Sequence, residues 1–437
     1  MNDSRNSAGL GLIFRALSHR NYRLFFGGQS ISLIGTWLQL TAVSWLVFRL
    51  THSSFLLGVV GFTSRIPTFL FASLAGVLVD RWNRHRLLVA TQVFSMIQAL
   101  ILAVLVLTDM IQVWHIIALS FFLGLVNAFD VPVRQSFVVD MIERREDLGN
   151  AIALNSSMVN GARLVGPAVA GILIATIGEG MCFLLNGLSF VAVIAALLAM
   201  RIAPKARDGH KTPLWRGLTE GYRYAFGFAP IRSLLLLLAL VSFMGMPYTV
   251  LMPVFAGKIL HGGPQTLGFL LGATGVGALA GTMFLASRKS VLGLGRIIAI
   301  ASTLFGIGLI AFSFSRLFVL SEILMVVTGF GMMVQMTSTN TVLQTIVDED
   351  KRGRVMSFYT MAFMGMVPFG SLFAGSLASA IGVPETTMIG GLSCIMGSVL
   401  FAKKLPALRK MVQPIYRERG IIFQEPLPTT SLKQGGM

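Results

Sequence analysis

Long apolar segments of about 20 to 25 residues, separated by short polar stretches, follow one another along almost the whole chain. About 20 apolar residues in a helix cross the hydrocarbon core of a bilayer, which is about 30 Å thick. Only 12% of the residues are charged, against about 25% in a typical soluble domain. We therefore expect an all-α polytopic membrane protein. The alternating strands of about 10 residues that a membrane β-barrel requires are absent from the sequence.

The apolar segments predict twelve membrane-spanning helices. Their expected positions are residues 22–48, 54–79, 87–107, 113–140, 149–176, 182–201, 232–256, 265–287, 294–313, 317–347, 354–381 and 385–402. The longest hydrophilic stretch inside the chain lies between the sixth and seventh segments, as a linker would. The predicted division is an N-terminal segment over 1–21, a six-helix bundle over 22–201, a linker over 202–231, a second six-helix bundle over 232–402 and a tail over 403–437.

The two sets of six helices resemble each other in sequence. Short matches occur at equivalent places in helices 1 and 7, 2 and 8, and 4 and 10 when the chain is compared with itself. The matching pairs are Ser32–Gly35 with Ser242–Gly245, Leu57–Gly58 with Leu267–Gly268, and Gln135–Val138 with Gln344–Val347. Two related six-helix halves are typical of many secondary transporters.

Basic residues decide the orientation of the chain. Nearly all of them lie in the two terminal segments and in the loops on the same side, whereas the opposite loops hold only Arg49, Lys258 and Arg316. Because cytoplasmic loops carry the excess of Lys and Arg, both termini are predicted to be cytoplasmic. The net charge of +17 is then a topology signal together with contact to anionic membrane lipids, and no nucleic-acid partner is expected.

The loop between the second and third helices carries a compact motif of one glycine and several charges, namely Gly76, Asp80, Arg81, Arg84 and Arg86. A glycine allows close helix contact, and charges at a membrane edge pair with each other or with helix ends. The motif resembles the signature loop of the major facilitator superfamily, Gly-x-x-x-Asp-Arg-x-Gly-Arg-Arg. The resemblance implies a role in gating. The alternative is a basic anchor that only fixes the topology.

The loop departs from the family pattern at two positions. Asn83 stands where the family has glycine, and His85 replaces one of the two closing basic residues. Asparagine tolerates the left-handed conformation, so we expect the shape of the loop to be kept.

Charges inside predicted spans point to function, because they are expensive there. Asp130 and Arg134 are one turn apart on helix 4, a spacing that suits an ion pair. Arg163 on helix 5 differs in depth from Asp130 by about 6 Å, which a long arginine side chain can bridge. We expect these three residues to couple proton movement to transport. The alternative is a permanent ion pair that fixes the packing.

Helix 5 carries a glycine–proline pattern, with Gly161, Gly166, Pro167 and Gly171, that resembles part of the antiporter motif of drug:proton exporters; Ala170 replaces one of its final glycines. Taken with the segment from helix 4 to helix 5, it resembles the bacterial efflux branch of the superfamily that includes the enterobactin exporter. This resemblance implies two six-helix bundles around a cavity lined by helices 1, 4, 7 and 10, in a bacterial cytoplasmic (inner) membrane.

Polar residues inside spans are candidates for lining that cavity. On helix 1 four of them fall on one face of the helix: Gln29, Ser32, Thr36 and Gln39. Arg65 lies near the midplane in helix 2, where it can attract an anionic substrate or pair with an acid, and Asn340 is among several polar residues of helix 10. The alternative for such residues is hydrogen bonding between helices.

The sequence therefore predicts a secondary transporter that exports a small amphiphilic molecule, such as a siderophore or a drug, by alternating access. The proton gradient is the expected energy source, since no nucleotide-binding motif occurs. A proton-coupled uptake symporter and an uncoupled lipid flippase or scramblase are the alternatives. No enzymatic constellation, cofactor or metal site is expected. The predicted partners are the substrate, protons and membrane lipids, with the chain as a monomer.

Overall fold

The computed structural model describes residues 14–201, 223–288 and 290–421, and it leaves the side chains of 72–74, 76–77 and 79–81 undescribed. The expected linker over 202–231 lies mostly outside these residues. The first half contains η1 (Arg15–Ser18), α2 (Arg20–Thr51), α3 (Ser54–Thr63), α4 (Ile66–Arg81), α5 (Arg84–Leu107), α6 (Val113–Asp140), η2 (Arg145–Asp147) and α7 (Leu148–Leu198). The second contains α9 (Ala229–Leu240), η3 (Val241–Gly245), α10 (Tyr248–Val254), η4 (Phe255–Ile259), α11 (Pro264–Ala286), α12 (Leu294–Phe314), α13 (Phe318–Ile346), α14 (Arg352–Thr360), η5 (Met361–Gly365), α15 (Met366–Ile381) and α16 (Val383–Glu418).

Two glycines explain how the described helices form twelve spans. Within the described residues, 11 helical stretches are long and apolar enough to cross a membrane. One of them, α7, contains two spans, because the chain reverses at Gly178 with φ 83° and ψ 167°. Gly382, with φ 104° and ψ 157°, makes the equivalent turn between α15 and α16. Only glycine adopts this region readily, so each turn needs a single residue where the sequence suggested a short loop.

Several spans are interrupted, which the apolar pattern did not predict. The second span breaks between α3 and α4, at Ser64 and Arg65, directly before Pro67. The seventh and eleventh spans contain π-helical turns, η3 to η5, close to prolines. Proline removes a helix hydrogen bond and disturbs the turn before it, which accounts for the break before Pro67 and for η3 and η5, which precede Pro247 and Pro368. η4 instead follows Pro253. The last helix, α16, continues to Glu418, beyond the expected end of its span at residue 402.

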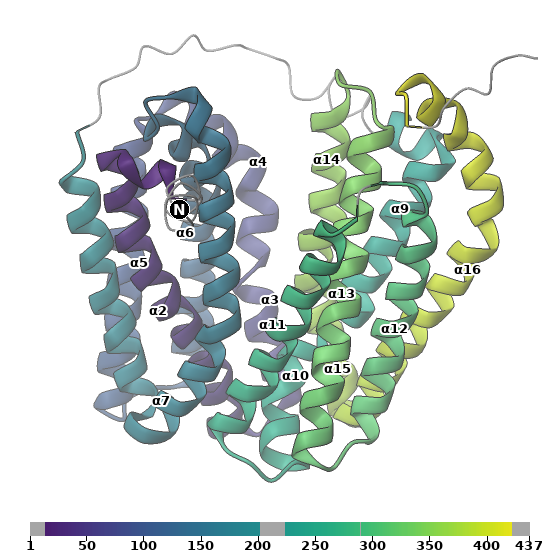
Figure 1. The fold of residues 1–437 in the computed structure, drawn as a ribbon. Coiled ribbons are helices and arrows are strands. Elements are labelled where there is room, and N and C mark those ends of the chain that lie inside the picture. The colour runs from purple at the N-terminus through teal and green to yellow at the C-terminus, as the bar shows by residue number, and fades with distance from the viewer. Residues whose placement is uncertain (1–13, 202–222, 289, 422–437) are drawn as a thin grey trace, which may run out of the picture.

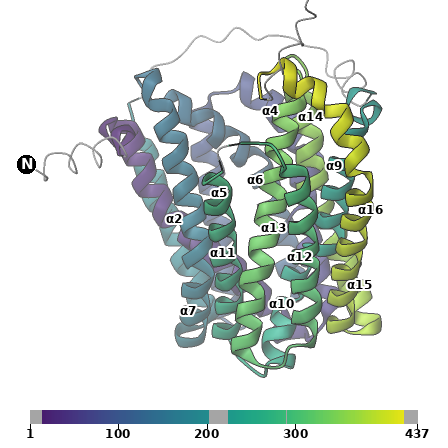
Figure 2. The same ribbon diagram turned by 45° about the vertical axis from the view of Figure 1, so that its right-hand side comes forward.

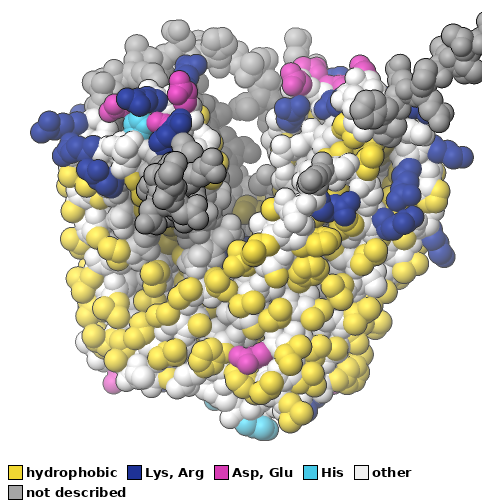
Figure 3. Space-filling model, in the orientation of Figure 1, with side chains coloured by type: hydrophobic (Ala, Val, Ile, Leu, Met, Phe, Trp, Pro, Cys, Tyr) yellow, Lys and Arg dark blue, Asp and Glu magenta, His cyan; other side chains and the backbone are white. Residues whose placement is uncertain are grey.

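The helices form two bundles that stand side by side (Figures 1 and 2). One bundle contains α2 to α7, and the other contains α9 to α16. One end of both bundles carries most of the Lys and Arg side chains, whereas the flanks are apolar (Figure 3). We call this the basic end; it is where α2, α5 and α12 begin. The opposite end, with the turns at Gly178 and Gly382, is called the far end.

Two close backbone contacts between the bundles lie toward the far end. Gly58 of α3 lies against Gly375 of α15, where a Cβ on Gly375 would come within 2.7 Å of the Gly58 Cα atom. Gly268 of α11 lies against Gly171 of α7, where a Cβ on Gly268 would come within 2.8 Å of the Gly171 Cα atom. At the basic end the surface is hollowed between the bundles (Figure 3).

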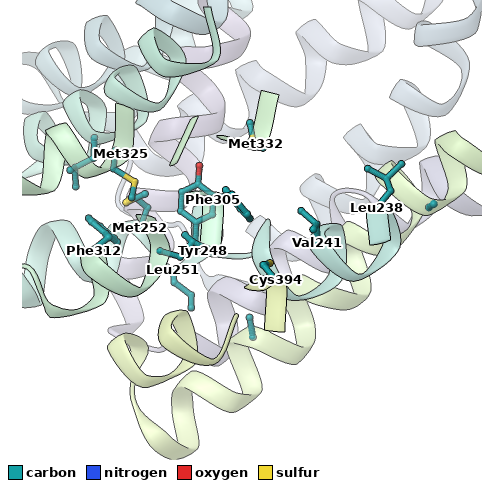
Figure 4. Close-up of a cluster of buried hydrophobic side chains, with 14 of the residues drawn as sticks. Leu238, Val241, Tyr248, Leu251, Met252, Phe305, Phe312, Met325, Met332 and Cys394 are labelled. Atoms are coloured by element: carbon teal, nitrogen blue, oxygen red, sulfur yellow. The ribbon is translucent and has the colours of Figure 1, made fainter. Parts of the chain in front are cut away.

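One apolar cluster of buried side chains extends through both bundles, and two smaller clusters lie within the first bundle. In the second bundle, Tyr248, Met252 and Phe305 are buried together at the place where α10 meets α12 (Figure 4). The rings of Phe255 and Phe312 pack with their centroids 4.4 Å apart. Such packing keeps the helices of one bundle together, because tightly packed interiors move as units rather than deform.

An ionic contact secures the basic end of the first bundle. Asp147 is buried and pairs with Arg15 and with His19, whose Nε2 atom lies 2.9 Å from Oδ2. The hydrogen bonds from His19 and Arg15 hold the pKa of Asp147 below its usual value. The carboxylate therefore stays ionised at neutral pH and ties the segment before α2 to the connection between α6 and α7.

Candidate functional site

A buried carboxylate in α6 is held by three donors. Asp130 is 2% exposed. Its Oδ1 atom accepts hydrogen bonds from Thr91 Oγ1 at 2.8 Å and from Gln92 Nε2 at 2.6 Å, both on α5. Arg134, one turn further along α6, pairs with Oδ2. All these donors favour the ionised carboxylate, whereas burial opposes it.

The sequence identified only part of this cluster. The pair of Asp130 with Arg134 forms as the i, i+4 spacing suggests. Arg163 does not join it: its described electrostatic neighbours are Arg65 and Tyr248. The physical reason is that axial depth, on which the expectation rested, says nothing about the face of the helix on which a residue lies. The α5 donors were missed, although Thr91, Ser95 and Gln98 form a polar stripe at i, i+4 and i+7.

Two arginines and a tyrosine form a second group near the middle of the spans. Arg65 and Arg163 are half-buried and close enough for their positive charges to repel. Tyr248 is 3% exposed, and its hydroxyl interacts with the charge of Arg163. Figure 4 shows its ring within the apolar cluster and its oxygen at the margin. The group combines elements from both bundles: the α3–α4 break, α7 and α10.

The polar stripe of α2 lies mainly inside the first bundle. Gln39 is 4% exposed; its Nε2 donates to Gln98 Oε1 at 2.8 Å, and its Oε1 accepts from Asn186 Nδ2 at 2.7 Å. The alternative stated above, hydrogen bonding between helices, therefore describes Gln39. Gln29 and Ser32 are buried as well, whereas Thr36 is exposed. A helical stripe identifies a face of α2, but both a cavity and a neighbouring helix offer polar partners to such a face.

Helix α13 contributes partly accessible polar groups to the second bundle. Asn340 is half-buried, and its Oδ1 accepts a hydrogen bond from Gln344, one turn later. Deeper along the helix, Gln335 is 1% exposed, and its Nε2 atom has no hydrogen-bond partner within the described residues. Asn340 is thus the more accessible of the two to a solute between the bundles.

The signature loop connects three helices of the first bundle. Arg84 lies 3.3 Å from Asp140 at the end of α6. His85 Nε2 lies 2.7 Å from the Leu197 carbonyl oxygen of α7. Asn83 takes an extended conformation, with φ −69°, and caps α5 by accepting from the Arg86 N–H at 3.1 Å. The tolerance of asparagine for a left-handed conformation is therefore not used here, because Asn83 serves as the N-cap, for which it is well suited.

For the remaining residues of the loop motif, the structure describes the backbone but not the side chains. Gly76, Asp80 and Arg81 belong to the last part of α4. Their side chains lie outside the described part of the chain, so their gating role stays a prediction.

The glycines of the α7 motif serve packing between different helices. Gly166 lies against the Trp37 ring of α2, where a Cβ would come within 2.5 Å. Gly171 makes the backbone contact with α11, and the Pro167 carbonyl oxygen faces Gly268 of that helix. Gly161 faces open space, with no atom within 4 Å of a Cβ built there. Three of the four motif positions thus shape the interfaces of α7.

No group of three or more His, Cys, Asp or Glu side chains in the described ranges is arranged to hold a metal ion. The arrangement does contain a buried carboxylate in contact with an arginine, and a pair of cations near mid-membrane. These groups can move a proton and bind a charged solute, respectively.

Twelve apolar spans, divided into two bundles that meet near one end, define a membrane transporter. The chain belongs to the transmembrane secretion effector family of the major facilitator superfamily, whose profile matches residues 13–434. It is accordingly an efflux-type transporter of the bacterial major facilitator class and not an enzyme.

Curated relatives include transporters and efflux pumps. The chain is 25% identical to the staphyloferrin A transporter of Staphylococcus aureus, over 87% of this chain and 95% of that protein. It is 24% identical to the multidrug efflux pump Tap of Mycolicibacterium fortuitum, over 86% and 93%. With the macrolide efflux protein A of Streptococcus pyogenes it shares 23%, over 85% and 94%.

Solved structures show the same fold at low sequence identity. The nucleoside transporter NupG superposes with a TM-score of 0.70 at 12% identity, over 89% of this chain and 99% of that one. An inward-facing bacterial homologue of ferroportin gives a TM-score of 0.67 at 15% identity, over 88% and 98%. The fold of the major facilitator superfamily is thereby shown.

Proposed function

We propose that this transporter exports a small amphiphilic molecule from the cytoplasm in exchange for protons, by alternating access in a bacterial cytoplasmic membrane. The basic end faces the cytoplasm in this proposal, since Lys and Arg accumulate on that side of membrane proteins. The described contacts between the bundles then lie toward the outer side, and the hollow opens inward.

The observation that carries the proposal is that the close glycine contacts of the two bundles lie toward one end of the molecule. They touch backbone to backbone at Gly58 with Gly375 and at Gly268 with Gly171. The two contacts join equivalent helices, because Gly58 and Gly268 are partners in the internal repeat. Such a symmetric pair of contacts suits rocking of one half against the other around a site near the midplane.

The buried Asp130 supports the coupling to protons. Its carboxylate is out of reach of bulk solvent, and its three donors come from two helices. If α5 or Arg134 moves when the bundles rock, the balance between burial and hydrogen bonding changes, and with it the affinity for a proton. The names of the relatives, which include efflux pumps for several drugs, support the direction of transport.

Everted membrane vesicles test the proposal directly, because their cytoplasmic face is turned outward. With a proton gradient generated by respiration, vesicles that contain the protein should accumulate an exported dye such as ethidium, and should release protons as they do so. A protonophore should abolish the accumulation. A strain without the gene should retain more of the dye than its parent.

The two alternatives give different results in the same preparation. Accumulation by right-side-out vesicles, with no accumulation by everted ones, identifies an uptake symporter. Equilibration of a fluorescent lipid between leaflets, independent of any gradient, identifies a scramblase. Either result overturns the exporter.

A further inference from the structure

Arg65 and Arg163 carry positive charges that no acid among the described side chains neutralises. Neither guanidinium forms a hydrogen bond or an ion pair with another described residue, although both are half-buried. An uncompensated arginine near the membrane centre is unfavourable, and two adjacent ones repel in addition. The other arginine placed within a span near mid-membrane, Arg134, has a carboxylate partner. The contrast indicates that the anionic partner of Arg65 and Arg163 comes from outside the protein.

The backbone around Arg65 is built to hold it in place. The residue stands at the break between α3 and α4 and precedes the first turn of α4. α6 supports the break closely: a Cβ on Gly124 would come within 2.5 Å of the Ser64 carbonyl oxygen, and Thr68 Oγ1 donates to the Gly124 carbonyl oxygen at 3.1 Å. The positive end of the α4 dipole is therefore presented at the same depth as the guanidinium, as at the interrupted helices that bind anions in other transporters.

Tyr248 adds an independent sign of a ligand. Its hydroxyl is buried and forms no hydrogen bond of good geometry with a described residue; its described polar neighbours are the Thr274 hydroxyl and the charge of Arg163. A buried hydroxyl without a partner loses free energy, unless a ligand or water supplies one. The ring of Tyr248 belongs to an apolar cluster with Leu251 and Phe305 (Figure 4). Through Tyr248 this apolar cluster adjoins Arg163, whose charge interacts with the tyrosine hydroxyl.

We infer that Arg65, Arg163 and Tyr248 form a binding site for an anionic amphiphile that carries two or more negative charges, such as a polycarboxylate with an apolar body. Carboxylates bind arginine through paired, charge-assisted hydrogen bonds, and an acceptor oxygen of the ligand can also satisfy the tyrosine hydroxyl. The inference rests on the proposed function, since it names the substrate class of the exporter. Because Arg65 and Arg163 lie on the first bundle and Tyr248 on the second, the ligand would contact both halves.

Charge-selective binding tests the site. The purified protein in detergent is titrated into carboxyfluorescein, an anionic dye, and separately into ethidium, a cationic dye, and binding is followed by fluorescence anisotropy. The variants are Arg65→Gln, Arg163→Gln, Arg65→Lys and Tyr248→Phe. The control is Arg316→Gln, which removes an exposed arginine at the far end. Size-exclusion profiles select variants that remain folded.

Both glutamine variants should bind carboxyfluorescein at least about tenfold more weakly, the loss expected for one charge-assisted hydrogen bond. Arg65→Lys should keep part of the affinity, Tyr248→Phe should lose a smaller part, and the control should match wild type. Ethidium affinity should stay equal or rise when an arginine is removed.

Equal binding of carboxyfluorescein by wild type and both glutamine variants overturns the site, as does its failure to bind wild type. Export is measured separately in everted vesicles, with carboxyfluorescein and with ethidium. Continued ethidium export alongside a failed anion test refutes the site and leaves the exporter intact. Anion binding without any proton-driven export refutes the exporter and keeps the site.

Discussion

Asp130 and Glu179 are both buried acids paired with an arginine, yet their surroundings differ. Asp130 lies within the first bundle, among donors from α5 and α6. Glu179 lies at the far end, directly after the turn at Gly178, and pairs with Arg49 at 2.8 Å. The first is placed near the middle of the spans, where a change of partner alters proton affinity. The second ties the ends of two neighbouring spans together.

Replacing Asp130 by asparagine should uncouple transport from the proton gradient. A potential of 100 mV acting on one charge is worth about 2.3 kcal/mol, which supports a substrate gradient of roughly 50-fold. Asp130→Asn should reduce that gradient to near unity in proteoliposomes while leaving downhill exchange and substrate binding in place. Uphill transport is measured with an imposed pH gradient, and binding with the dyes described above.

The matched control is Glu179→Gln, which removes a buried acid that pairs with an arginine at the far end. We expect it to lower thermal stability and to preserve uphill transport. If the Asp130→Asn variant transports uphill normally, another group carries the coupled proton. Joint loss of folded protein and binding assigns Asp130 to packing alone.

At the residue scale, sequence spacing predicted partners on one helix but not between helices. The pair of Asp130 and Arg134 follows from the periodicity of a single helix. The contacts of Asp130 with Thr91 and Gln92, and of Gln39 with Asn186, depend on how helices rotate against each other. Arg163 shows the same limit, since the rise per residue gives its depth along the helix but not the direction of its side chain.

Among the elements, α11 shows how small residues set the distance between the bundles. Its interface with α7 contains Gly268, which leaves no space for a side chain, and Gly272, whose Cβ would find its nearest atom at 3.5 Å, an ordinary contact. The two glycines lie one turn apart on the same face. They therefore offer a comparison in which position alone differs.

Gly268→Ala should open the contact at the far end, because the new methyl group overlaps the backbone of α7. Overpacking of this kind is unfavourable by about 1 to 3 kcal/mol, which shifts a two-state equilibrium by roughly 5- to 150-fold. The expected readout is faster labelling of a single cysteine, introduced at the exposed Lys258, by a membrane-impermeant thiol reagent.

In the Gly272→Ala variant, the cysteine introduced at position 258 should be labelled at the wild-type rate. Equal labelling of the two alanine variants would mean that the contact at Gly268 does not hold the far end closed.

The number and order of the elements followed from the apolar segments, whereas their interruptions did not. A window of apolar residues averages over the break at Ser64 and Arg65 and over the π-helical turns, because neither changes hydrophobicity. The turns at Gly178 and Gly382 were expected as short loops, since no pattern of apolar residues reveals that one glycine with positive φ suffices.

For the whole molecule, the internal repeat predicts which ends approach each other in the opposite state. Gln135 of α6 and Gln344 of α13 occupy equivalent positions near the basic end, and both are exposed. His52 and Lys258 lie at the far end, where Lys258 Nζ donates to the His52 carbonyl oxygen at 3.1 Å. The native cysteines, Cys182 and Cys394, are buried, so introduced cysteines can be labelled selectively.

Cysteine pairs at these positions should crosslink in a mutually exclusive manner under alternating access. A bifunctional thiol reagent should bridge the pair at 52 and 258 in the state described here, and should bridge the pair at 135 and 344 only after the bundles rock. Bridging either pair should abolish transport, and substrate should change the ratio of the two products. Simultaneous bridging of both pairs with transport intact contradicts the rocking of rigid halves.

The two glycine contacts also determine how far each part of the protein travels. They act as a fulcrum placed toward one end of two long levers, since a helix of the length of α13 measures about 44 Å at 1.5 Å per residue. A tilt of about 10° around such a fulcrum moves the distant tip of a helix by about 7 Å but barely displaces atoms beside the fulcrum. A narrow rearrangement on one face of the membrane thus becomes a wide aperture on the other.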